Sequence, residues 1–449
     1  MYYSGQTCKN QHVCGKVNSV GRIIEMSIRD NVRKMKEVSP VVASLDVRIR
    51  DAALRAVAAS LTSRKEEIFA ANREDLARAD RDGIADSVRK RLRFDEHKLS
   101  DCLAGIDSLL ALEDPAGRIT LKRELDEGLV LERVTVPIGV IGIIFEARPD
   151  ALVQISCLCI KSGNCAVLKG GKETASTNKV LFELIRDAAC SAGIPEGSLL
   201  QASAHSEIDE LLECDDCVDL LIPRGSNAFV RYIMDHTRIP VMGHADGLCH
   251  IYVDKAADQE KALRIIVDAK TQYTAACNAV ETLLIHKDIA GEFVPKLAET
   301  LKEEHVVLRG TRDITDLAGG ETIGIGDFRE YLDLIVSAAV VNDEDEAIRH
   351  INTYGSHHTD AIITEDPKAA ERFMQLVDSA GVYQNCSTRF ADGFRYGFGA
   401  EVGISTSKLH ARGPVGLDGL VTYKYRLYGE GQIVGDYASG KSEFHFRDN

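Results

Sequence analysis

One stretch of the sequence combines residue types that suit covalent catalysis. The residues around Cys277 are small, namely Ala275, Ala276 and Ala279. They leave room for a substrate carbonyl carbon to approach the sulfur of Cys277, and the backbone N–H of Asn278 is a candidate donor to the oxyanion that forms. Free cysteines are more often small buried apolar residues, so the local pattern leaves both interpretations open. The catalytic interpretation predicts a nucleophile at Cys277, assisted by Asn278.

Two turns earlier in the chain have the composition of phosphate-binding loops. Each follows a predicted strand, and they read Lys169-Gly170-Gly171-Lys172 and Arg224-Gly225-Ser226. Glycine lets the backbone approach a ligand closely, and the second turn opens a predicted helix whose first N–H groups can hold a phosphate. Neither turn has the G-x-G-x-x-G spacing of the usual dinucleotide fingerprint. The two turns therefore support each other, and neither is decisive alone.

The totals of the chain exclude several classes of protein. A length of 449 residues with 45% hydrophobic residues is enough for two or three domains, each with its own core. The formal net charge of -15 argues against binding to nucleic acid or to an acidic membrane surface. No apolar run approaches the roughly 20 residues that span a bilayer. Cysteines without regular spacing suit a reducing compartment, so we expect a cytoplasmic protein.

The periodicity of apolar residues predicts an α/β fold. Residues 27–114 have helical spacing, whereas 119–125 and 129–136 alternate as two strands of a hairpin. Beyond the hairpin, short apolar runs alternate with amphipathic helices, which is typical of parallel sheets that bind ligands at the carboxyl ends of their strands. The tail at 422–436 is strand-like again and is expected to join the hairpin. The other expected strands are 138–144, 165–168, 198–201, 218–222, 239–242, 282–286, 306–308, 334–341, 361–364 and 381–383.

These patterns divide the chain into two doubly wound α/β domains and a small β-hairpin element. One domain is expected to bind the cofactor and the other to carry Cys277. We expect the hairpin and the tail to form an oligomerisation element, because exposed strand edges commonly pair with a second subunit. The expected boundaries are 1–25 for a disordered leader before Met26, 26–118 and 137–253 for the cofactor domain, 254–417 for the catalytic domain, and 119–136 and 418–449 for the oligomerisation element.

Six stretches in order along the chain resemble motifs of the aldehyde dehydrogenase superfamily. They are 142–149, 161–173, 221–225, 277–282, 387–390, and 399–402 together with 408–414. Within the superfamily they are most similar to the branch that acts on glutamate 5-phosphate. The resemblance implies an NADPH-dependent reduction of L-glutamate 5-phosphate to L-glutamate 5-semialdehyde and phosphate. It also implies a thioester on Cys277 and a place as the second step of proline biosynthesis.

The resemblance further implies which residues contact NADPH. Lys169 matches a lysine that contacts the cofactor ribose. Lys172 stands where NAD-preferring relatives often carry an acid, and a cation there suits the 2′-phosphate of NADPH. The turn at 224–226 matches the turn under the cofactor phosphates, with Gly170 and Gly171 in the other turn. Glu330 corresponds to a glutamate near the nicotinamide ribose, although the residues after it differ.

Three arginines in the matched motifs are implied as substrate ligands, because a guanidinium clamps a carboxylate or a phosphate with two bonds. They are Arg148, Arg389 and Arg412. For each of them the alternative that it only anchors a loop stays open. Asp150 stands where close relatives commonly have asparagine. Its charge would repel an anionic substrate, so we expect no direct contact between them.

The chain departs from the hydrolytic members of the superfamily at one point. Those enzymes carry a Glu-Leu-Gly-Gly stretch whose glutamate activates water on the thioester, and this chain has His244-Ala245-Asp246-Gly247 instead. Without that carboxylate the acyl enzyme should be left to hydride or to phosphate. His244 could itself act as a base, but a lone histidine is more often structural.

No metal site is expected. Cys214 and Cys217 have half the spacing of a zinc site, but no second pair of Cys or His residues stands at the required distance. His357 and His358 follow a Gly-Ser turn signal and are interpreted as part of a solvated turn. The resemblance assigns them no ligand.

Two rival hypotheses and the partners complete the expectations. The chain could be another acyl-reducing enzyme of the same fold, or a non-catalytic NADP-binding protein that kept the fold. No kinase segment is recognisable, so the acyl phosphate is expected from a separate glutamate 5-kinase. Its short lifetime in water makes a functional partnership with that kinase plausible. The hairpin and tail predict a homodimer or a homotetramer.

Overall fold

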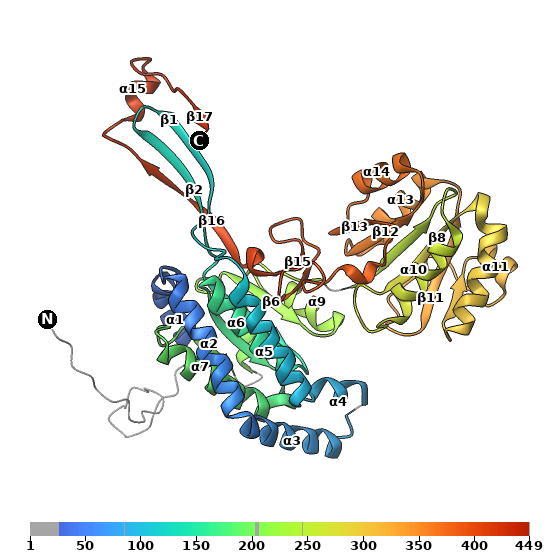
Figure 1. Ribbon diagram of the computed structural model, residues 1–449, viewed down its shortest axis with the longest axis horizontal. Coiled ribbons are helices and arrows are strands. Elements are labelled where there is room, and N and C mark those ends of the chain that lie inside the picture. Colours follow the sequence, from blue (N-terminus) through green and yellow to red (C-terminus); the bar gives the residue numbers. More distant parts are fainter. Residues whose placement is uncertain (1–26, 85, 203–205, 245, 449) are drawn as a thin grey trace.

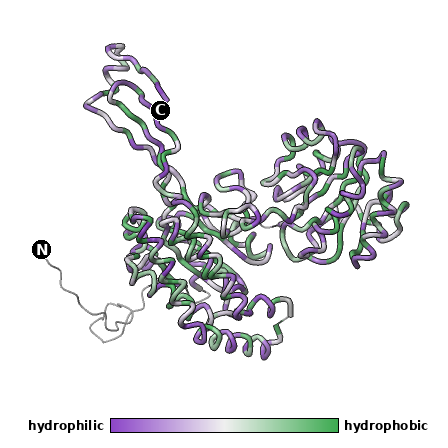
Figure 2. The backbone as a smooth tube through the Cα atoms, viewed as in Figure 1, coloured by the Kyte–Doolittle hydropathy of each residue, from purple (hydrophilic) through white to green (hydrophobic). Residues whose placement is uncertain are grey.

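The structure is a computed structural model that describes residues 27–84, 86–202, 206–244 and 246–448. The expected leader at 1–25 lies outside these residues. Figure 1 shows two α/β bodies and a long arm that projects from the first of them. Figure 2 shows hydrophobic stretches recurring inside both bodies. No helix among the described residues is long and apolar enough to cross a membrane.

The first body is built on a parallel sheet of order β5-β4-β3-β6. Its strands are β3 (Val140–Phe145), β4 (Cys165–Gly170), β5 (Leu199–Ala202) and β6 (Leu220–Arg224). Side chains alternate between the two faces of a strand, so Ile141 and Ile143 pack into one core while Val140 and Ile144 pack into another. The sheet is therefore covered by helices on both faces, as the alternating pattern predicted.

Nine helices of the described residues belong to this body. They are α1 (Ile28–Ala43), α2 (Val47–Ser63), α3 (Lys65–Arg81), α4 (Asp86–Leu92), α5 (Glu96–Ala111), α6 (Pro149–Ser162), α7 (Ala175–Ser191), α8 (Ser206–Leu212) and α9 (Asn227–Asp235). Helices α2, α5, α6 and α7 contribute to the core on one face, whereas α1, α8 and α9 contribute to the core on the other. Helix α6 illustrates the local signals: it begins at Pro149 and ends before Gly163, which has a left-handed φ of 77°.

The second body contains a parallel sheet of order β10-β9-β11-β8-β7-β12-β13. Its strands are β7 (Cys249–Val253), β8 (Val280–His286), β9 (Val307–Gly310), β10 (Glu321–Thr322), β11 (Ile335–Val341), β12 (Thr359–Ile363) and β13 (Gly381–Gln384). Its helices are α10 (Gln259–Thr271), α11 (Lys287–Glu303), α12 (Arg312–Ala318), α13 (Glu344–Tyr354) and α14 (Pro367–Leu376). Cores on both faces of the sheet make this a second doubly wound unit.

The chain crosses between the two bodies at other points than the sequence suggested. Strand β7 falls within the range expected for the cofactor domain, but it pairs with β8 and β12 of the second sheet. Residues near the expected end of the catalytic domain, among them Val402 and Val415, pack into the core of the first body. Val402 precedes β14 (Gly403–Ser405) and Val415 is the last residue of β15 (Gly413–Val415), and these two strands form a separate two-stranded sheet. The strand expected at 239–242 is reduced to one isolated bridge between Leu221 and Val241.

The arm is an antiparallel sheet of order β16-β2-β1-β17. Its elements are β1 (Ile119–Asp126), β2 (Leu129–Pro137), β16 (Val421–Tyr428), the short helix α15 (Val434–Ala438) and β17 (Arg447–Asp448). The tail thus joins the hairpin, as the sequence predicted. Strand β16 forms one edge of this sheet and carries exposed aromatic side chains, namely Tyr423, Tyr425 and Tyr428.

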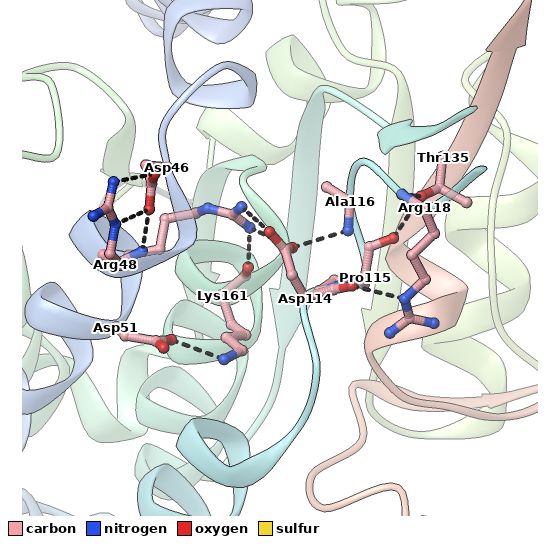
Figure 3. A network of polar contacts seen from close by, with 10 residues as sticks. Asp46, Arg48, Asp51, Asp114, Pro115, Ala116, Arg118, Thr135 and Lys161 are labelled. Atoms are coloured by element: carbon pink, nitrogen blue, oxygen red, sulfur yellow. Dashed lines mark hydrogen bonds and ion pairs between the residues drawn. The ribbon is translucent and has the colours of Figure 1, made fainter. Parts of the chain in front are cut away.

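A polar network fastens the base of the arm to the first body (Figure 3). The buried guanidinium of Arg50 donates to both carboxylate oxygens of Asp114, at 3.1 and 2.6 Å, and to the carbonyl of Lys161. Arg118 donates to the Asp114 carbonyl at 2.7 Å, and its own N–H bonds to the hydroxyl of Thr135 at 2.9 Å. Since Arg50 lies in α2 and Thr135 in β2, these bonds set the direction in which the arm leaves the first body.

Candidate active site

A cavity of about 950 Å³ lies where the two bodies meet. The first body contributes the segments after the carboxyl ends of β3 and β6, including Arg148 and Ser226. The second body contributes the loop between α10 and β8, which carries Cys277. The cavity is therefore lined by residues of both predicted phosphate-binding turns and by the predicted nucleophile.

The loop that carries Cys277 is held rigidly at both ends. Lys270, at the end of α10, donates to Glu281 at the start of β8 over 2.7 Å, and both side chains are buried. Gly247 lies directly on the loop, since a Cβ atom there would be 2.4 Å from the Cys277 carbonyl oxygen and 2.8 Å from its Cα. Any residue but glycine at position 247 would displace the loop. Cys277 itself stays partly exposed toward the cavity.

His358 lies directly beside the predicted nucleophile, Cys277. Its Nε2 atom is 3.2 Å from the Sγ atom of Cys277, and the imidazole is fully buried. Its Nδ1 atom is 3.0 Å from the hydroxyl of Thr359. The interpretation of His358 as part of a solvated turn was wrong. His357 alone matches it, because His357 is half-buried, has a left-handed φ of 58° and makes no contact with Cys277 among the described residues.

Two further side chains surround this pair. Cys249 donates to the carbonyl of Cys277 at 3.4 Å, and burial raises the pKa of the Cys249 thiol far above its ordinary value, so it stays protonated. His244 places its ring 4.8 Å from the ring of His358 in an edge-to-face arrangement. Its Nδ1 atom lies 2.8 Å from the carbonyl of Ile404, and burial lowers the pKa of His244, which favours the neutral ring. His244 therefore lines the cavity directly, next to His358.

Asn278 contributes its backbone to the cavity and uses its side chain elsewhere. The side-chain amide donates to the carbonyl of Ala391 at 2.7 Å, and the Asn278 carbonyl accepts from the hydroxyl of Thr388 at 2.7 Å. Asn278 thus fixes the segment that carries Arg389. Among the described residues nothing accepts from the backbone N–H of Asn278, so this donor remains free for a ligand.

Three arginines that line the cavity have no carboxylate partner among the described residues. Arg389 is buried, and its Nε bonds only to Gln272 at 3.0 Å. Arg224 donates to the carbonyl of Val402 at 2.6 Å. Arg148 lies close enough to lower the pKa of Arg224 by charge repulsion. Burial lowers the pKa of Arg224 and of Arg389, and for each a neighbouring arginine adds to the effect. Since arginine stays protonated in proteins, these unpaired cations favour an anion in the cavity.

The backbone before Arg148 is in an unusual conformation. Ala147 has a φ of 50°, in the left-handed region that favours glycine, and its N–H donates to Glu173 at 2.6 Å. Glu173 follows the glycine turn after β4, so this bond ties that turn to the segment after β3. This bond therefore helps to hold Arg148 just beyond the carboxyl end of β3.

Four of the predicted site residues do not line the cavity, namely Lys169, Gly170, Gly171 and Arg412. Arg412 donates to Asp378 at 3.0 Å and lines a separate, smaller cavity instead. Lys169 is buried and donates to the carbonyl of Gly170 at 2.6 Å, and burial lowers its pKa. Neither side chain lines the space around Cys277. Asp150 forms an ion pair with Lys98 at 3.0 Å, which compensates its charge.

The remaining predicted cofactor residues do line the cavity. Helix α9 begins after Ser226 without a side-chain cap, so its first N–H groups face the cavity without an internal partner. Lys172 is exposed there and has no carboxylate partner among the described residues. Glu330 accepts a hydrogen bond from Asn227 and so links the two bodies. Arg91 in α4 also lines the cavity, although the sequence pattern of the helical layer indicated no chemistry there.

The cysteine pair considered for a metal site lies apart from a second group of possible metal ligands. Cys214 and Cys217 are buried in the first body, and burial is the main reason that their pKa values lie above the ordinary range. Both side chains pack into the hydrophobic core of the first body, as structural cysteines do. A different cluster has metal-ligating geometry: one donor atom each from His244, Cys277 and His358 lie within 4.8 Å of one another. The sequence contained no spacing signal for it.

Comparisons with known proteins agree on the family. The profile of the aldehyde dehydrogenase family matches residues 8–315. A gamma-glutamyl phosphate reductase of Pelotomaculum thermopropionicum is 55% identical over 94% of this chain and 98% of its own length.

Solved structures give the same result. The crystal structure of a gamma-glutamyl phosphate reductase from Thermotoga maritima matches with a TM-score of 0.88 and 38% identity, covering 90% of this chain and 99% of that one. A more distant structure, an engineered glycolyl-CoA reductase with bound NADP+, is 14% identical with a TM-score of 0.62 and covers 89% of this chain and 96% of its own. The second comparison supports the fold alone.

Proposed function

Because the chain belongs to the aldehyde dehydrogenase family, and within it to the gamma-glutamyl phosphate reductases, we propose that it reduces L-glutamate 5-phosphate to L-glutamate 5-semialdehyde and phosphate with NADPH. This is the second step of proline biosynthesis from glutamate. The observation that carries the proposal is the position of Cys277, beside a histidine and among unpaired arginines. An acyl phosphate is an anion with an electrophilic carbon, and this site matches both properties.

The covalent step uses Cys277 and His358. The Nε2 atom of His358 accepts the thiol proton, and the sulfur attacks the acyl carbon of glutamate 5-phosphate. The backbone N–H of Asn278 donates to the oxyanion, phosphate leaves, and a thioester remains on Cys277. NADPH, when bound, supplies the hydride that reduces this thioester. Release of the aldehyde returns the sulfur to its starting state beside His358.

The same residues explain why the thioester is not hydrolysed. The segment that carries the water-activating glutamate in hydrolytic relatives contains His244 here, and its Nδ1 atom is held by the Ile404 carbonyl. Two carboxylates that line the cavity are engaged elsewhere, since Glu146 accepts from Ser226 at 3.0 Å and Glu401 accepts from Gly393 at 2.8 Å. Neither Glu146 nor Glu401 is therefore free to act as a base on water.

The residues around the turns fit a nicotinamide dinucleotide. A Cβ atom at Gly225 would come within 2.5 Å of Glu146, and one at Gly171 within 2.0 Å of Glu173, so a larger residue in either turn would require the end of that glutamate side chain to move. The uncapped start of α9 would hold the pyrophosphate. Glu330 would hold the nicotinamide ribose, and Lys172 would meet the 2′-phosphate that distinguishes NADPH from NADH.

Lys172→Glu should reverse part of the cofactor preference. We expect kcat/KM for NADPH to fall roughly 10- to 100-fold, because the variant replaces a charge-assisted hydrogen bond with repulsion, while kcat/KM for NADH holds or rises. Steady-state rates with each cofactor measure the change. Lys179→Glu is the matched control, since it makes the same charge change on α7 outside the cavity. Equal losses with both cofactors would contradict the assignment of Lys172.

Arg389→Gln should weaken substrate binding more than it slows chemistry. We expect the KM for glutamate 5-phosphate to rise roughly 10- to 100-fold, because a charge-assisted contact of about 1.5 to 3 kcal/mol is lost. Arg412→Gln is the comparison, since Arg412 is already paired with Asp378 outside the cavity. A larger rise of KM in Arg412→Gln than in Arg389→Gln would return the substrate role to Arg412.

The reverse reaction tests the function as a whole. The purified chain should form NADPH from glutamate semialdehyde, supplied as its cyclic form, together with NADP+, and only when inorganic phosphate is present. NADPH formation that does not depend on phosphate would indicate a hydrolytic aldehyde dehydrogenase. No turnover by a folded chain would favour a non-catalytic NADP-binding protein.

We also propose that the arm pairs with a second copy of the chain. Among the described residues strand β16 has a free edge, and Tyr423, Tyr425 and Leu427, which share one face of the strand, are exposed beside it, where a partner strand could cover them. The acyl phosphate would come from a separate glutamate 5-kinase, and its short lifetime favours transfer at close range. Sedimentation of the chain, alone and mixed with such a kinase, measures both associations. A monomer under all conditions would contradict the first.

A further inference from the structure

The donor atoms around Cys277 are arranged as a metal-binding site. His244, Cys277 and His358 come from three segments of the chain, and one donor atom of each lies within 4.8 Å of the others. Two of these atoms, Sγ of Cys277 and Nε2 of His358, are already 3.2 Å apart. In a tetrahedral zinc site with Zn–S near 2.3 Å and Zn–N near 2.0 Å, neighbouring donors are about 3.3 to 3.6 Å apart. A movement of His244 by about 1 Å would therefore complete the geometry.

Hydrogen-bond partners at Nδ1 of both imidazoles leave their Nε2 atoms available to a metal ion. The Nδ1 atom of His244 is 2.8 Å from the carbonyl of Ile404, which can only accept, so Nδ1 carries the proton and Nε2 has a free lone pair. The Nδ1 atom of His358 has the hydroxyl of Thr359 at 3.0 Å, which leaves Nε2 toward Cys277. Histidines that bind metal ions commonly have such a partner on the other nitrogen.

We propose that His244, Cys277 and His358 bind Zn²⁺ with one thiolate and two imidazoles, and that this binding inhibits the enzyme. Thiolate and imidazole are the ligands that Zn²⁺ prefers, and the cavity leaves its fourth position to water. The reaction needs Cys277 free, so the bound metal removes the nucleophile. The inhibitory half of this inference rests on the proposed role of Cys277, whereas metal binding itself does not.

The competition between metal and substrate has a definite direction. Zn²⁺ and the acyl phosphate both need the sulfur of Cys277, so each excludes the other. Saturating glutamate 5-phosphate should therefore raise the Zn²⁺ concentration that gives half inhibition. Zn²⁺ should also protect Cys277 from alkylation by iodoacetamide in the absence of any substrate.

Cobalt substitution tests binding without turnover. Co²⁺ added to the metal-free wild type should produce the near-ultraviolet band of a thiolate-to-cobalt charge transfer and the visible bands of a tetrahedral ion. The charge-transfer band should vanish in Cys277→Ala. A band of unchanged intensity in that variant would place the metal at other cysteines and overturn the proposal.

The histidine ligand is tested with a near-isosteric variant. His244→Asn retains a side-chain N–H that can donate to the Ile404 carbonyl but lacks the second ring nitrogen. The Zn²⁺ affinity, measured by competition with a chromogenic chelator, should fall at least about tenfold, and half inhibition relative to the metal-free rate of the same variant should shift equally. His357→Asn is the matched control, because His357 is outside the cluster and asparagine tolerates its left-handed backbone. Equal Zn²⁺ affinities of wild type and His244→Asn would contradict the site.

Discussion

Replacing Cys277 with alanine should abolish reduction of glutamate 5-phosphate, with kcat falling at least about 10⁴-fold. The loss is large because the sulfur makes the only covalent bond to the substrate, and no other cysteine among the described residues is placed to substitute for it. Cys249 is the nearest, but its thiol is buried, protonated and bonded to the Cys277 carbonyl. The measurement is NADPH consumption in the forward direction and phosphate-dependent NADPH formation in reverse.

Two controls separate this effect from a loss of folding. The variant should still bind NADPH, measured by cofactor fluorescence, because the turns and α9 lie in the other body. Cys190 and Cys386 are the other cysteines of the described residues that are not buried, and Cys190→Ala should retain full activity. Rapid labelling by iodoacetamide should disappear in Cys277→Ala and persist in Cys190→Ala. Substantial reductase activity in a folded Cys277→Ala would disprove the thioester mechanism.

His358→Asn should lower kcat/KM roughly 30- to 100-fold at pH 7. The side chain of asparagine can still bond to Thr359, but it lacks the Nε2 atom that faces Cys277. A cysteine thiol without a base beside it is only a few per cent ionised at pH 7, which sets the size of the loss. Because an unassisted thiol ionises as the pH approaches about 8.5, the deficit should shrink as the pH rises. Rates of Cys277 alkylation by iodoacetamide across the same pH range give a second measure that needs no substrate.

The neighbouring histidine provides the control for this prediction. His357 bonds to the carbonyl of Asp378 and has no contact with Cys277 among the described residues, so His357→Asn should leave the pH profile unchanged. A purely structural role of His358 would reduce activity by the same factor at every pH. Such a constant deficit, or an alkylation rate equal to that of the wild type, would refute His358 as the base.

The local patterns of the sequence determined most of the elements. The helical spacing indicated a helical layer from residue 27 onward, and the structure adds the caps that start its helices, Ser27 for α1 and Asp46 for α2. Strand β8 was recognisable as a short apolar run, because a parallel strand is buried on both faces. The prediction of a strand at 239–242 was wrong. This segment forms only one bridge to the first sheet, at Val241, and its apolar side chains are buried without a strand being formed.

The sequence by itself determined the two-sheet fold and the family, and it singled out Cys277 with its small neighbours as the predicted nucleophile, because each of these is encoded in residues that lie next to one another in the chain. It did not determine the partner of that nucleophile. Strands β7, β8 and β12 are parallel neighbours, so their amino ends meet at one edge and bring His358 within 3.2 Å of Cys277 across 81 residues of sequence. The general rule places ligands at the carboxyl ends of strands, and the first sheet obeys it, whereas the second sheet presents its amino ends. Arg389 and Arg412 could not be told apart in the sequence, because each is an arginine within a matched motif. Only the packing of one sheet edge against the other decided that Arg389 lies in the cavity and Arg412 outside it.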